Sequence, residues 1–180
     1  MKMRLASLVL AGLTLTAPLA APLVALATPQ PARPVPAQLY SGRWYEVARI
    51  PNQLQRDCEG ASSDFAAFDG GHFRVVQVCH HGAPTGPAQT FNASGQILPD
   101  SNNAKMNLSF FGGIVRVEYW ILDRAEDGTW AIMGTSNGRY VWLLSRRPVL
   151  DATQRDRAIA RMAQLGYPVA RLQFPAQQAR

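Results

Sequence analysis

The chain has 180 residues, of which 47% are hydrophobic and 17% charged, a balance typical of one globular domain rather than of a disordered chain. The formal net charge is +6, but the arginines are scattered and form no recognised motif, so nothing indicates a nucleic-acid-binding protein. The positive charge favours only weak attraction to anionic surfaces.

Residues 1–27 have the layout of a secretory signal peptide. Lys2 and Arg4 precede a long uncharged stretch, and small residues near its end suit cleavage after Ala27. A retained membrane anchor is the alternative, but two prolines interrupt the stretch and disfavour a spanning helix. The segment holds no cysteine that could carry a lipid. We therefore expect an exported, soluble protein of the periplasm or extracellular space, without a lipid anchor.

A proline-rich leader is expected between the signal and the folded domain. Residues 28–38 contain four prolines, which predict an extended and mobile segment. The domain itself is expected over residues 39–175, and residues 176–180 are expected to form a short tail.

Eight strand-like segments follow one another with short turn signals between them. Such turn signals are Asp69-Gly70-Gly71 and Gly112-Gly113. Connections this short favour an antiparallel, up-and-down arrangement. The expected strands are residues 43–50, 62–68, 73–80, 88–98, 105–111, 114–123, 129–135 and 139–146.

Cys58 and Cys79 are the two cysteines, and in an oxidising compartment such a pair usually forms a disulfide. Closing this loop stabilises the fold by about 3 kcal/mol in the chain-entropy model. The alternatives are two free thiols or a partial metal site with His80 or His81. Adjacent residues on a strand point to opposite faces, so these histidines cannot easily share a site with Cys79. We expect neither a metal nor another cofactor.

The alternation of side chains along the strands defines a set of inward-facing residues. In residues 114–123, Arg116 and Glu118 share one face, so Val117 and Tyr119 should lie on the inner face. The residues expected to face inward and contact a ligand are Phe65, Val75, Phe91, Met106, Leu108, Phe110, Val117, Tyr119, Tyr140 and Trp142.

One helix is expected over residues 150–166. Asp151 is a plausible N-cap, with Gln154 three residues later as in a capping box. The apolar side chains form one narrow stripe that should lie against the outside of the sheet, and Gly166 is a natural stop. A short extended piece is expected at residues 167–174. Together these elements predict an all-β, eight-stranded antiparallel barrel with one C-terminal helix, although periodicity alone also allows an open two-sheet sandwich.

Three blocks of the sequence resemble the lipocalin family. They are SGRWYEVARIP at residues 41–51, YWILD followed by TWAIMGT at 119–135, and YVWLLSRRP at 140–148. Their order and spacing, with the helix after them, are similar to the bacterial lipocalins related to apolipoprotein D. The resemblance covers roughly residues 39–174 and implies a barrel with an internal cavity.

The resemblance also implies a structural barrel plug made of Gly42, Trp44 and Arg146. In lipocalins the tryptophan closes the narrow end of the barrel, and the arginine of the last strand lies across it. A guanidinium over an indole face gains cation–π energy and keeps its donors for backbone carbonyls. Gly42 allows the sharp turn into the strand. The block is therefore expected to be structural and not catalytic.

Binding, storage or transport of a small hydrophobic ligand is the function that the barrel and its inward residues predict. The resemblance implies a fatty acid or lysophospholipid in the bacterial cell envelope. The inward residues could instead fill a solid core. Glu46 and Gln77 could face the lumen and meet a ligand head group, and Glu46 could equally pair with an arginine near the rim.

Two other functions stay open, a lipocalin-fold enzyme and an interaction module that binds through loops such as residues 81–87. The sequence offers no nucleophile elbow and no metal-spaced cluster, so we do not expect an enzyme. The expected partner is a small hydrophobic lipid and not a nucleic acid. Peripheral contact with a membrane surface and a homodimer remain open.

Overall fold

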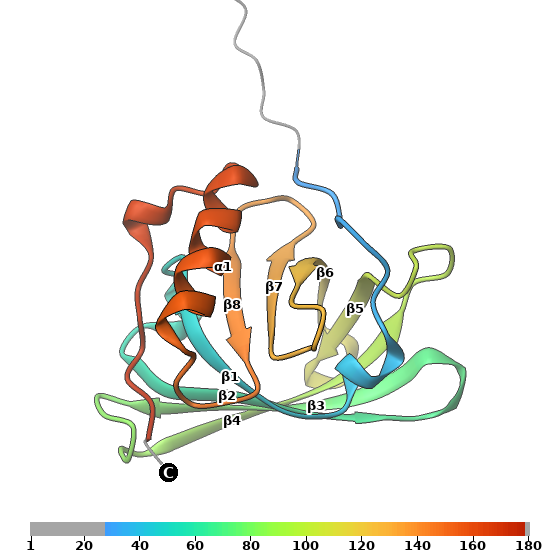
Figure 1. Ribbon diagram of the computed structural model, residues 1–180. Coiled ribbons are helices and arrows are strands. Elements are labelled where there is room, and N and C mark those ends of the chain that lie inside the picture. Colours follow the sequence, from blue (N-terminus) through green and yellow to red (C-terminus); the bar gives the residue numbers. More distant parts are fainter. Residues whose placement is uncertain (1–27, 179–180) are drawn as a thin grey trace, which may run out of the picture.

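A computed structural model describes residues 28–178, which form a closed barrel of eight antiparallel strands. Each strand pairs with its neighbours along the chain, and the eighth pairs with the first. Figure 1 shows the barrel with its single long helix on the outside. The predicted barrel with a C-terminal helix is therefore confirmed, and the open sandwich is wrong. The predicted signal peptide, residues 1–27, lies outside the described residues.

The observed strands lie close to the predicted ranges. The largest difference is in β2, which begins four residues earlier than predicted, because a register shift between Glu59 and Ser62 interrupts the side-chain alternation there. The elements are β1 (Gly42–Arg49), β2 (Cys58–Ala67), β3 (His72–His81), β4 (Ala88–Ile97), β5 (Lys105–Phe110), β6 (Val115–Arg124), β7 (Trp130–Thr135), β8 (Val141–Ser145) and α1 (Ala152–Gln164).

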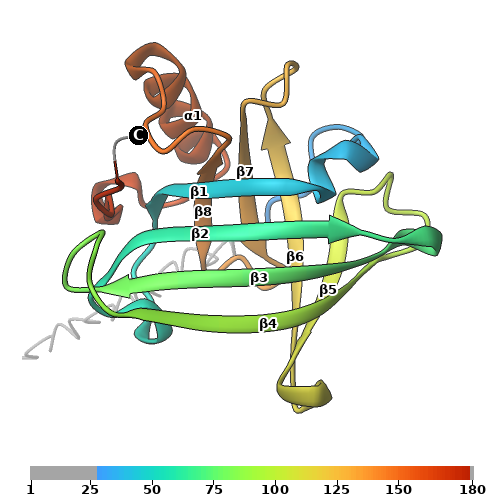
Figure 2. The ribbon, with the colours of Figure 1, turned by 90° about the horizontal axis from the view of Figure 1, so that it is seen from below.

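Two apolar clusters hold the molecule together. One lies inside the barrel and contains Trp44, Phe73 and Met106, all of them buried. The other lies between α1 and the outside of the sheet, where Met162 packs with Leu143 and their neighbours. Figure 2 shows β1 to β4 side by side as one curved wall, with α1 beyond it. Burial on both faces explains why the first four residues of β8, Val141 to Leu144, are all apolar and do not alternate.

The helix α1 begins as predicted, but its capping box is only half formed. The Asp151 carboxylate accepts from the backbone N–H groups of Thr153 and Gln154 at 3.0 and 3.2 Å. The Gln154 side chain donates instead to the Thr129 hydroxyl at 3.4 Å. It therefore ties the first turn of α1 to the β6–β7 connection. Gly166 follows the helix with a φ of +88°, a left-handed conformation that favours glycine.

The leader, residues 28–38, makes hydrogen bonds, an ion pair and apolar contacts with the barrel, which the expected extended and mobile leader did not include. The Ala32 N–H donates to the Leu122 carbonyl at 2.8 Å, and the Val35 N–H donates to the Asn102 carbonyl at 2.9 Å. The Val35 side chain is only 2% exposed. Proline content predicted an extended backbone but could not reveal that one apolar side chain is buried. Figure 1 shows the leader, in blue, descending beside β5 and β6.

Asp123, at the end of β6, joins the leader to the helix. Its carboxylate lies 3.0 Å from the Arg33 guanidinium and 2.7 Å from that of Arg161 in α1. The carboxylate is buried and both arginines are partly exposed.

The C-terminal segment also returns to the barrel. Gln173 exchanges two backbone hydrogen bonds with Arg49, and the Gln177 side chain donates to the Glu46 carbonyl at 2.8 Å. The predicted extended piece at 167–174 is interrupted by a 3-10 turn, Val169–Arg171. Over residues 28–178, no helix combines the length and the hydropathy needed to span a bilayer.

Candidate functional site

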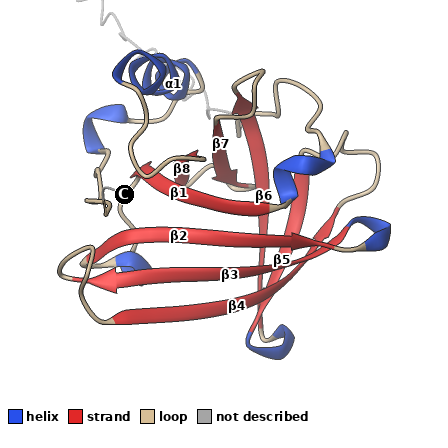
Figure 3. Cartoon of the chain, turned by 60° about the horizontal axis from the view of Figure 1, so that its bottom comes forward, coloured by secondary structure: helices blue, strands red, loops and turns tan. Residues whose placement is uncertain are grey.

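A large cavity opens at the end of the barrel where the β1–β2 and β5–β6 connections lie. Its volume is about 980 Å³, part of which is open solvent, and its walls come from all eight strands and these two connections. Figure 3 shows the β5–β6 connection as the short helix beyond the lower ends of those strands. The lining residues are Glu46, Asn52, Leu54, Gln55, Ala61, Ser62, Ser63, Gln77, Val78, Cys79, Phe91, Phe110, Phe111, Val115, Val117, Tyr119, Met133, Trp142 and Leu144.

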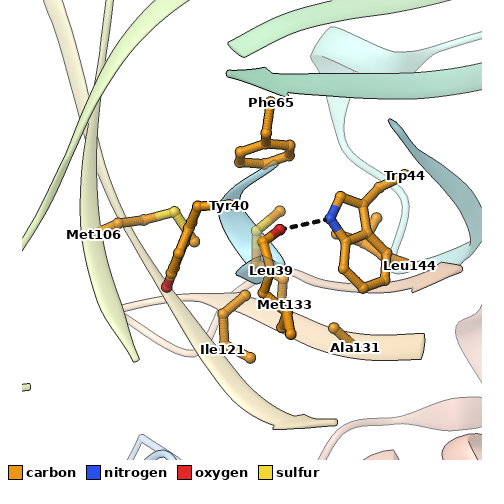
Figure 4. Close-up of a pocket in the computed structure, with 9 residues that line it drawn as sticks. All are labelled: Leu39, Tyr40, Trp44, Phe65, Met106, Ile121, Ala131, Met133 and Leu144. Atoms are coloured by element: carbon orange, nitrogen blue, oxygen red, sulfur yellow. Dashed lines mark hydrogen bonds between the residues drawn. The ribbon is translucent and has the colours of Figure 1, made fainter. Parts of the chain in front are cut away.

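A smaller pocket of about 250 Å³ lies deeper, towards the closed end. It shares Met133 and Leu144 with the large cavity, so the two spaces adjoin along the barrel axis. Figure 4 shows its nine lining residues, which are Leu39, Tyr40, Trp44, Phe65, Met106, Ile121, Ala131, Met133 and Leu144. Burial raises the pKa of the Tyr40 hydroxyl well above its usual value.

Gly42, Trp44 and Arg146 meet at this closed end. The Arg146 guanidinium carbon lies 3.8 Å from the centre of the Trp44 ring, and the indole N–H donates to the Leu39 carbonyl at 2.9 Å. Gly42 has a φ of +70°, and a Cβ there would lie 3.5 Å from an Arg146 nitrogen. Burial lowers the pKa of Arg146. Its terminal nitrogens donate to the carbonyls of Gln38, Leu39, Ser41 and Arg43.

The ten residues predicted to contact a ligand divide into three groups. Five line the large cavity, namely Phe91, Phe110, Val117, Tyr119 and Trp142. Phe65 and Met106 line the deep pocket. Val75 and Leu108 are buried in the barrel core between neighbours, and Tyr140 is partly buried against both apolar clusters. These last three therefore contribute to packing rather than to a cavity wall.

The cavity wall carries neutral polar side chains among the apolar ones, including Ser63, Gln77 and Tyr119. Ser63, Gln77 and Phe91 are directly opposite one another on β2, β3 and β4, so they share the inner face. Tyr119 lies on β6, with its ring 5.7 Å from that of Trp142 in an edge-on contact. Burial raises the pKa of Tyr119 to about 12.

A buried ion pair lies beside the cavity mouth. The Arg49 guanidinium donates to one Glu46 carboxylate oxygen at 2.5 Å, and the Gln55 amide donates to the other at 2.6 Å. Gln55 in turn accepts from the Trp142 indole at 2.8 Å. Glu46 therefore lines the lumen and pairs with an arginine, while its contact with a ligand head group stays a prediction. Burial raises the pKa of Glu46, although Arg49 and Gln55 oppose that rise.

Sequence reasoning missed the cavity residues that lie on connections. Asn52, Leu54 and Gln55 belong to the β1–β2 connection, and Phe111 begins the β5–β6 connection. The β1–β2 segment has no strand periodicity, and Phe111 was expected as the last residue of a strand, so no pattern placed these residues at the cavity mouth. The exposed apolar side chains of Leu54 and Phe111 were the available signal, because apolar residues are unusual in tight polar turns.

The predicted disulfide joins Cys58 to Cys79, with the two Cα atoms 5.4 Å apart. It connects the open-end halves of β2 and β3, and Cys79 also lines the cavity. Both sulfurs are in the bond. Neither cysteine is therefore available as the nucleophile that the enzyme hypothesis required.

Comparison with known proteins agrees with this architecture. The family model of the lipocalin-like domain matches residues 35–177. Outer membrane lipoprotein Blc of Vibrio cholerae is 29% identical over 143 residues, or 77% of this chain and 81% of that protein. The protein of the same name from Escherichia coli K12 is 26% identical over 154 residues, or 82% and 86%. Rat apolipoprotein D is 25% identical over 118 residues, or 62% and 60%.

Solved structures show the same fold at low identity. Insecticyanin of the tobacco hornworm Manduca sexta has a TM-score of 0.66 at 16% identity, covering 84% of this chain and 85% of that one. Lobster apocrustacyanin A1 has a TM-score of 0.63 at 15% identity, covering 88% and 94%.

These relatives correct the expected localisation. Several of the similar bacterial proteins are named outer membrane lipoproteins, which contradicts the expectation of a protein without a lipid anchor. That expectation depended on the lack of a cysteine in residues 1–27, and such a lack does not decide how a protein is held at a membrane.

Lipocalins are generally binding and transport proteins that take up small hydrophobic ligands. With a matched domain over residues 35–177 and the eight-stranded barrel, the chain belongs to the lipocalin family, among the bacterial and apolipoprotein D-like members.

Proposed function

We propose that this protein binds and carries a single-chain lipid, such as a fatty acid or a lysophospholipid, in the bacterial cell envelope. The observation that carries the proposal is the cavity, which is open at one end and lined mostly by apolar and aromatic side chains. Each methylene removed from water contributes about 0.8 kcal/mol, so even a partly enclosed chain is bound with useful affinity. The names of the bacterial relatives, outer membrane lipoproteins, support a role at the envelope.

The proposed role is binding rather than catalysis. Among the described residues that line the cavity, the ionisable side chains are Tyr119 and Glu46. Both carboxylate oxygens of Glu46 already accept hydrogen bonds, one from Arg49 and the other from Gln55. A general acid or base must reach the substrate with a free proton or lone pair. Glu46 is poorly suited to that task, which favours a carrier.

The cavity mouth is proposed to touch a membrane surface while lipid is exchanged. Its apolar rim consists of Leu54, Phe111, Ile114 and Val115, which are 84%, 62%, 85% and 41% exposed. Exposed apolar clusters of this kind mark contact sites. Arg56 and Arg116 are exposed next to the rim in sequence and would favour an anionic lipid surface. Acyl chains could then pass between bilayer and cavity without crossing water.

Native mass spectrometry after gentle purification tests lipid carriage. The proposal predicts a bound mass that organic extraction removes and that fragments as a single-chain lipid. Protein that is empty after purification, and that takes up no long-chain lipid at micromolar concentration, would contradict it.

For membrane contact, the double variant Leu54→Asp with Ile114→Asp should no longer sediment with anionic vesicles, because it places two negative charges on the apolar rim. The control Val149→Asp, at an exposed valine outside the rim, should leave sedimentation unchanged.

A further inference from the structure

We infer that the cavity prefers single-chain lipids with an uncharged, hydrogen-bonding head group, such as monoacylglycerols, over free fatty acids. This inference rests on the proposed lipid carriage and names the ligand class of the same cavity. The inference follows from comparing the polar groups of the cavity wall that already form hydrogen bonds within the protein with those that do not.

Over residues 28–178, no lysine, arginine or histidine side chain lines the cavity. Among the lining residues that the structure describes, Glu46 is the sole member of the Asp, Glu, Lys, Arg and His group. Its partner Arg49 does not reach the wall, and the terminal nitrogens of Arg49 donate to Glu46 and to the carbonyls of Gln55 and Cys58. A ligand carboxylate inside the barrel would therefore find no positive partner, and it would lie near a carboxylate of its own sign.

Neutral hydrogen-bonding groups are present instead. Ser63 and Gln77 are neighbours on the inner faces of β2 and β3, and Tyr119 lines the same space from β6. Over residues 28–178, none of these three side chains hydrogen-bonds to another residue of the protein. The Tyr119 hydroxyl is protonated at neutral pH, as in any tyrosine, and burial raises its pKa further, to about 12, so it is available as a donor. These groups can donate to and accept from a hydroxyl, an ester or an amide.

Desolvation decides between the two kinds of head group. A hydroxyl or ester that leaves water and forms new hydrogen bonds loses little free energy, whereas a carboxylate without a cation loses far more. A fatty acid would have to leave its carboxylate in water at the mouth, where the head group forms no hydrogen bonds with Ser63, Gln77 and Tyr119, or bear the cost of burying the charge. A monoacylglycerol can bring its head group down to Ser63, Gln77 and Tyr119.

The test compares two ligands of equal chain length on delipidated wild-type protein. Palmitate and 1-monopalmitoylglycerol, each below its aggregation concentration, displace the neutral dye Nile red at pH 8. We expect the glyceride to bind at least about tenfold more tightly. Equal affinities, or tighter binding of palmitate, would overturn the inference and leave lipid carriage standing. Failure of both ligands to bind would overturn lipid carriage and the inference with it.

A charge placed on the wall should reverse the preference. Gln77→Lys introduces a cation among the neutral groups and should shift the palmitate-to-glyceride affinity ratio about tenfold towards palmitate. Gln77→Met, with nearly the same length and no charge, is the matched control and should weaken only the glyceride. An unchanged ratio in Gln77→Lys would overturn the inference.

A milder variant covers the case in which Gln77→Lys does not fold. Tyr119→Phe removes one hydroxyl and almost no volume, so the fold and the acyl-chain contacts should persist. The glyceride affinity should fall severalfold, while that of palmitate should stay the same. Equal losses for both ligands would mean that the hydroxyl does not contact the head group.

Discussion

At the scale of single residues, the contact between Trp44 and Arg146 closes the barrel. The guanidinium stacks on the indole and donates to four carbonyls of the chain entering β1. Arg146→Ala should lower the free energy of unfolding by about 1–2 kcal/mol, and Arg146→Lys should restore only part of it because an ammonium lacks the planar fork. Urea unfolding measures both, and an Arg146→Ala variant with wild-type stability would contradict this role.

Glu46 and Arg49 form a buried pair on β1, and Arg43 and Asp64 form an exposed one nearby. Glu46 is 5% exposed, and its removal would leave the Arg49 charge buried without a partner. Glu46→Ala should therefore destabilise by about 3–5 kcal/mol. Asp64→Ala breaks the exposed pair and should cost at most about 1 kcal/mol. Denaturant unfolding of the two variants side by side measures the difference, and equal losses would refute the distinction.

Residue-level prediction from sequence succeeded where parity and local chemistry agreed. Trp44 could be placed beside Arg146 because the family blocks around the first and last strands are well defined, and these two strands pair in the closed barrel. Val75 and Leu108 have the same inward parity as Phe91 and Phe110, yet they lie in packed layers and not on the cavity wall. The alternation of side chains along a strand tells which of them point inward. It does not tell how far along the barrel axis each one lies, which decides between the packed core and the cavity wall and depends on the strand register and tilt.

At the scale of elements, the disulfide holds β2 and β3 together near the cavity mouth. Intact-mass measurement with alkylation, on protein purified without reductant, should find neither Cys58 nor Cys79 modified. Reduction should then lower the free energy of unfolding by about 3 kcal/mol, since it frees a loop with a sequence separation of 21 residues. Two alkylated cysteines before reduction would show that the bond does not form.

The leader is a structural element of the barrel, and Val35 offers a direct test of that attachment. Val35→Ala should lower the free energy of unfolding by about 1–2 kcal/mol, because it leaves a small void among buried neighbours. Val149→Ala is the matched control at a side chain that is 67% exposed, and it should change stability by less than about 0.5 kcal/mol. Thermal unfolding compares them, and a neutral Val35→Ala would argue that the leader does not stabilise the barrel.

Elements were predicted well where alternation or capping was regular, as in β6 and α1. The conformations of the connections between strands were not predicted, because they depend on contacts that form only in the folded barrel. Gln55 is an example: its side chain bridges Glu46 and Trp142, residues from opposite ends of the sequence. Nothing local to the β1–β2 connection indicates that it covers the cavity mouth.

At the scale of the whole molecule, the closed barrel and its helix followed from strand count, short connections and the family blocks. The family resemblance implied an internal cavity, but the side-chain pattern alone did not, since an apolar inner face suits a solid core as well as a cavity. The size of the cavity results from the summed volumes of side chains on eight strands, and Ala61, Ser62 and Ser63 leave space that larger residues would fill. The volume left free can be calculated only once the strand register shows which side chains lie at the same level of the barrel.

Val117→Trp on delipidated protein tests lipid carriage most directly. Val117 lines the large cavity, so a tryptophan there should occupy the space of an acyl chain without disturbing the barrel. Thermal unfolding run beside displacement of a fluorescent fatty acid should give an unchanged melting temperature and lost lipid binding. In a solid barrel the same change would overpack the core and destabilise it by roughly 1–3 kcal/mol. A destabilised variant, together with wild-type protein that binds no long-chain lipid, would contradict lipid carriage.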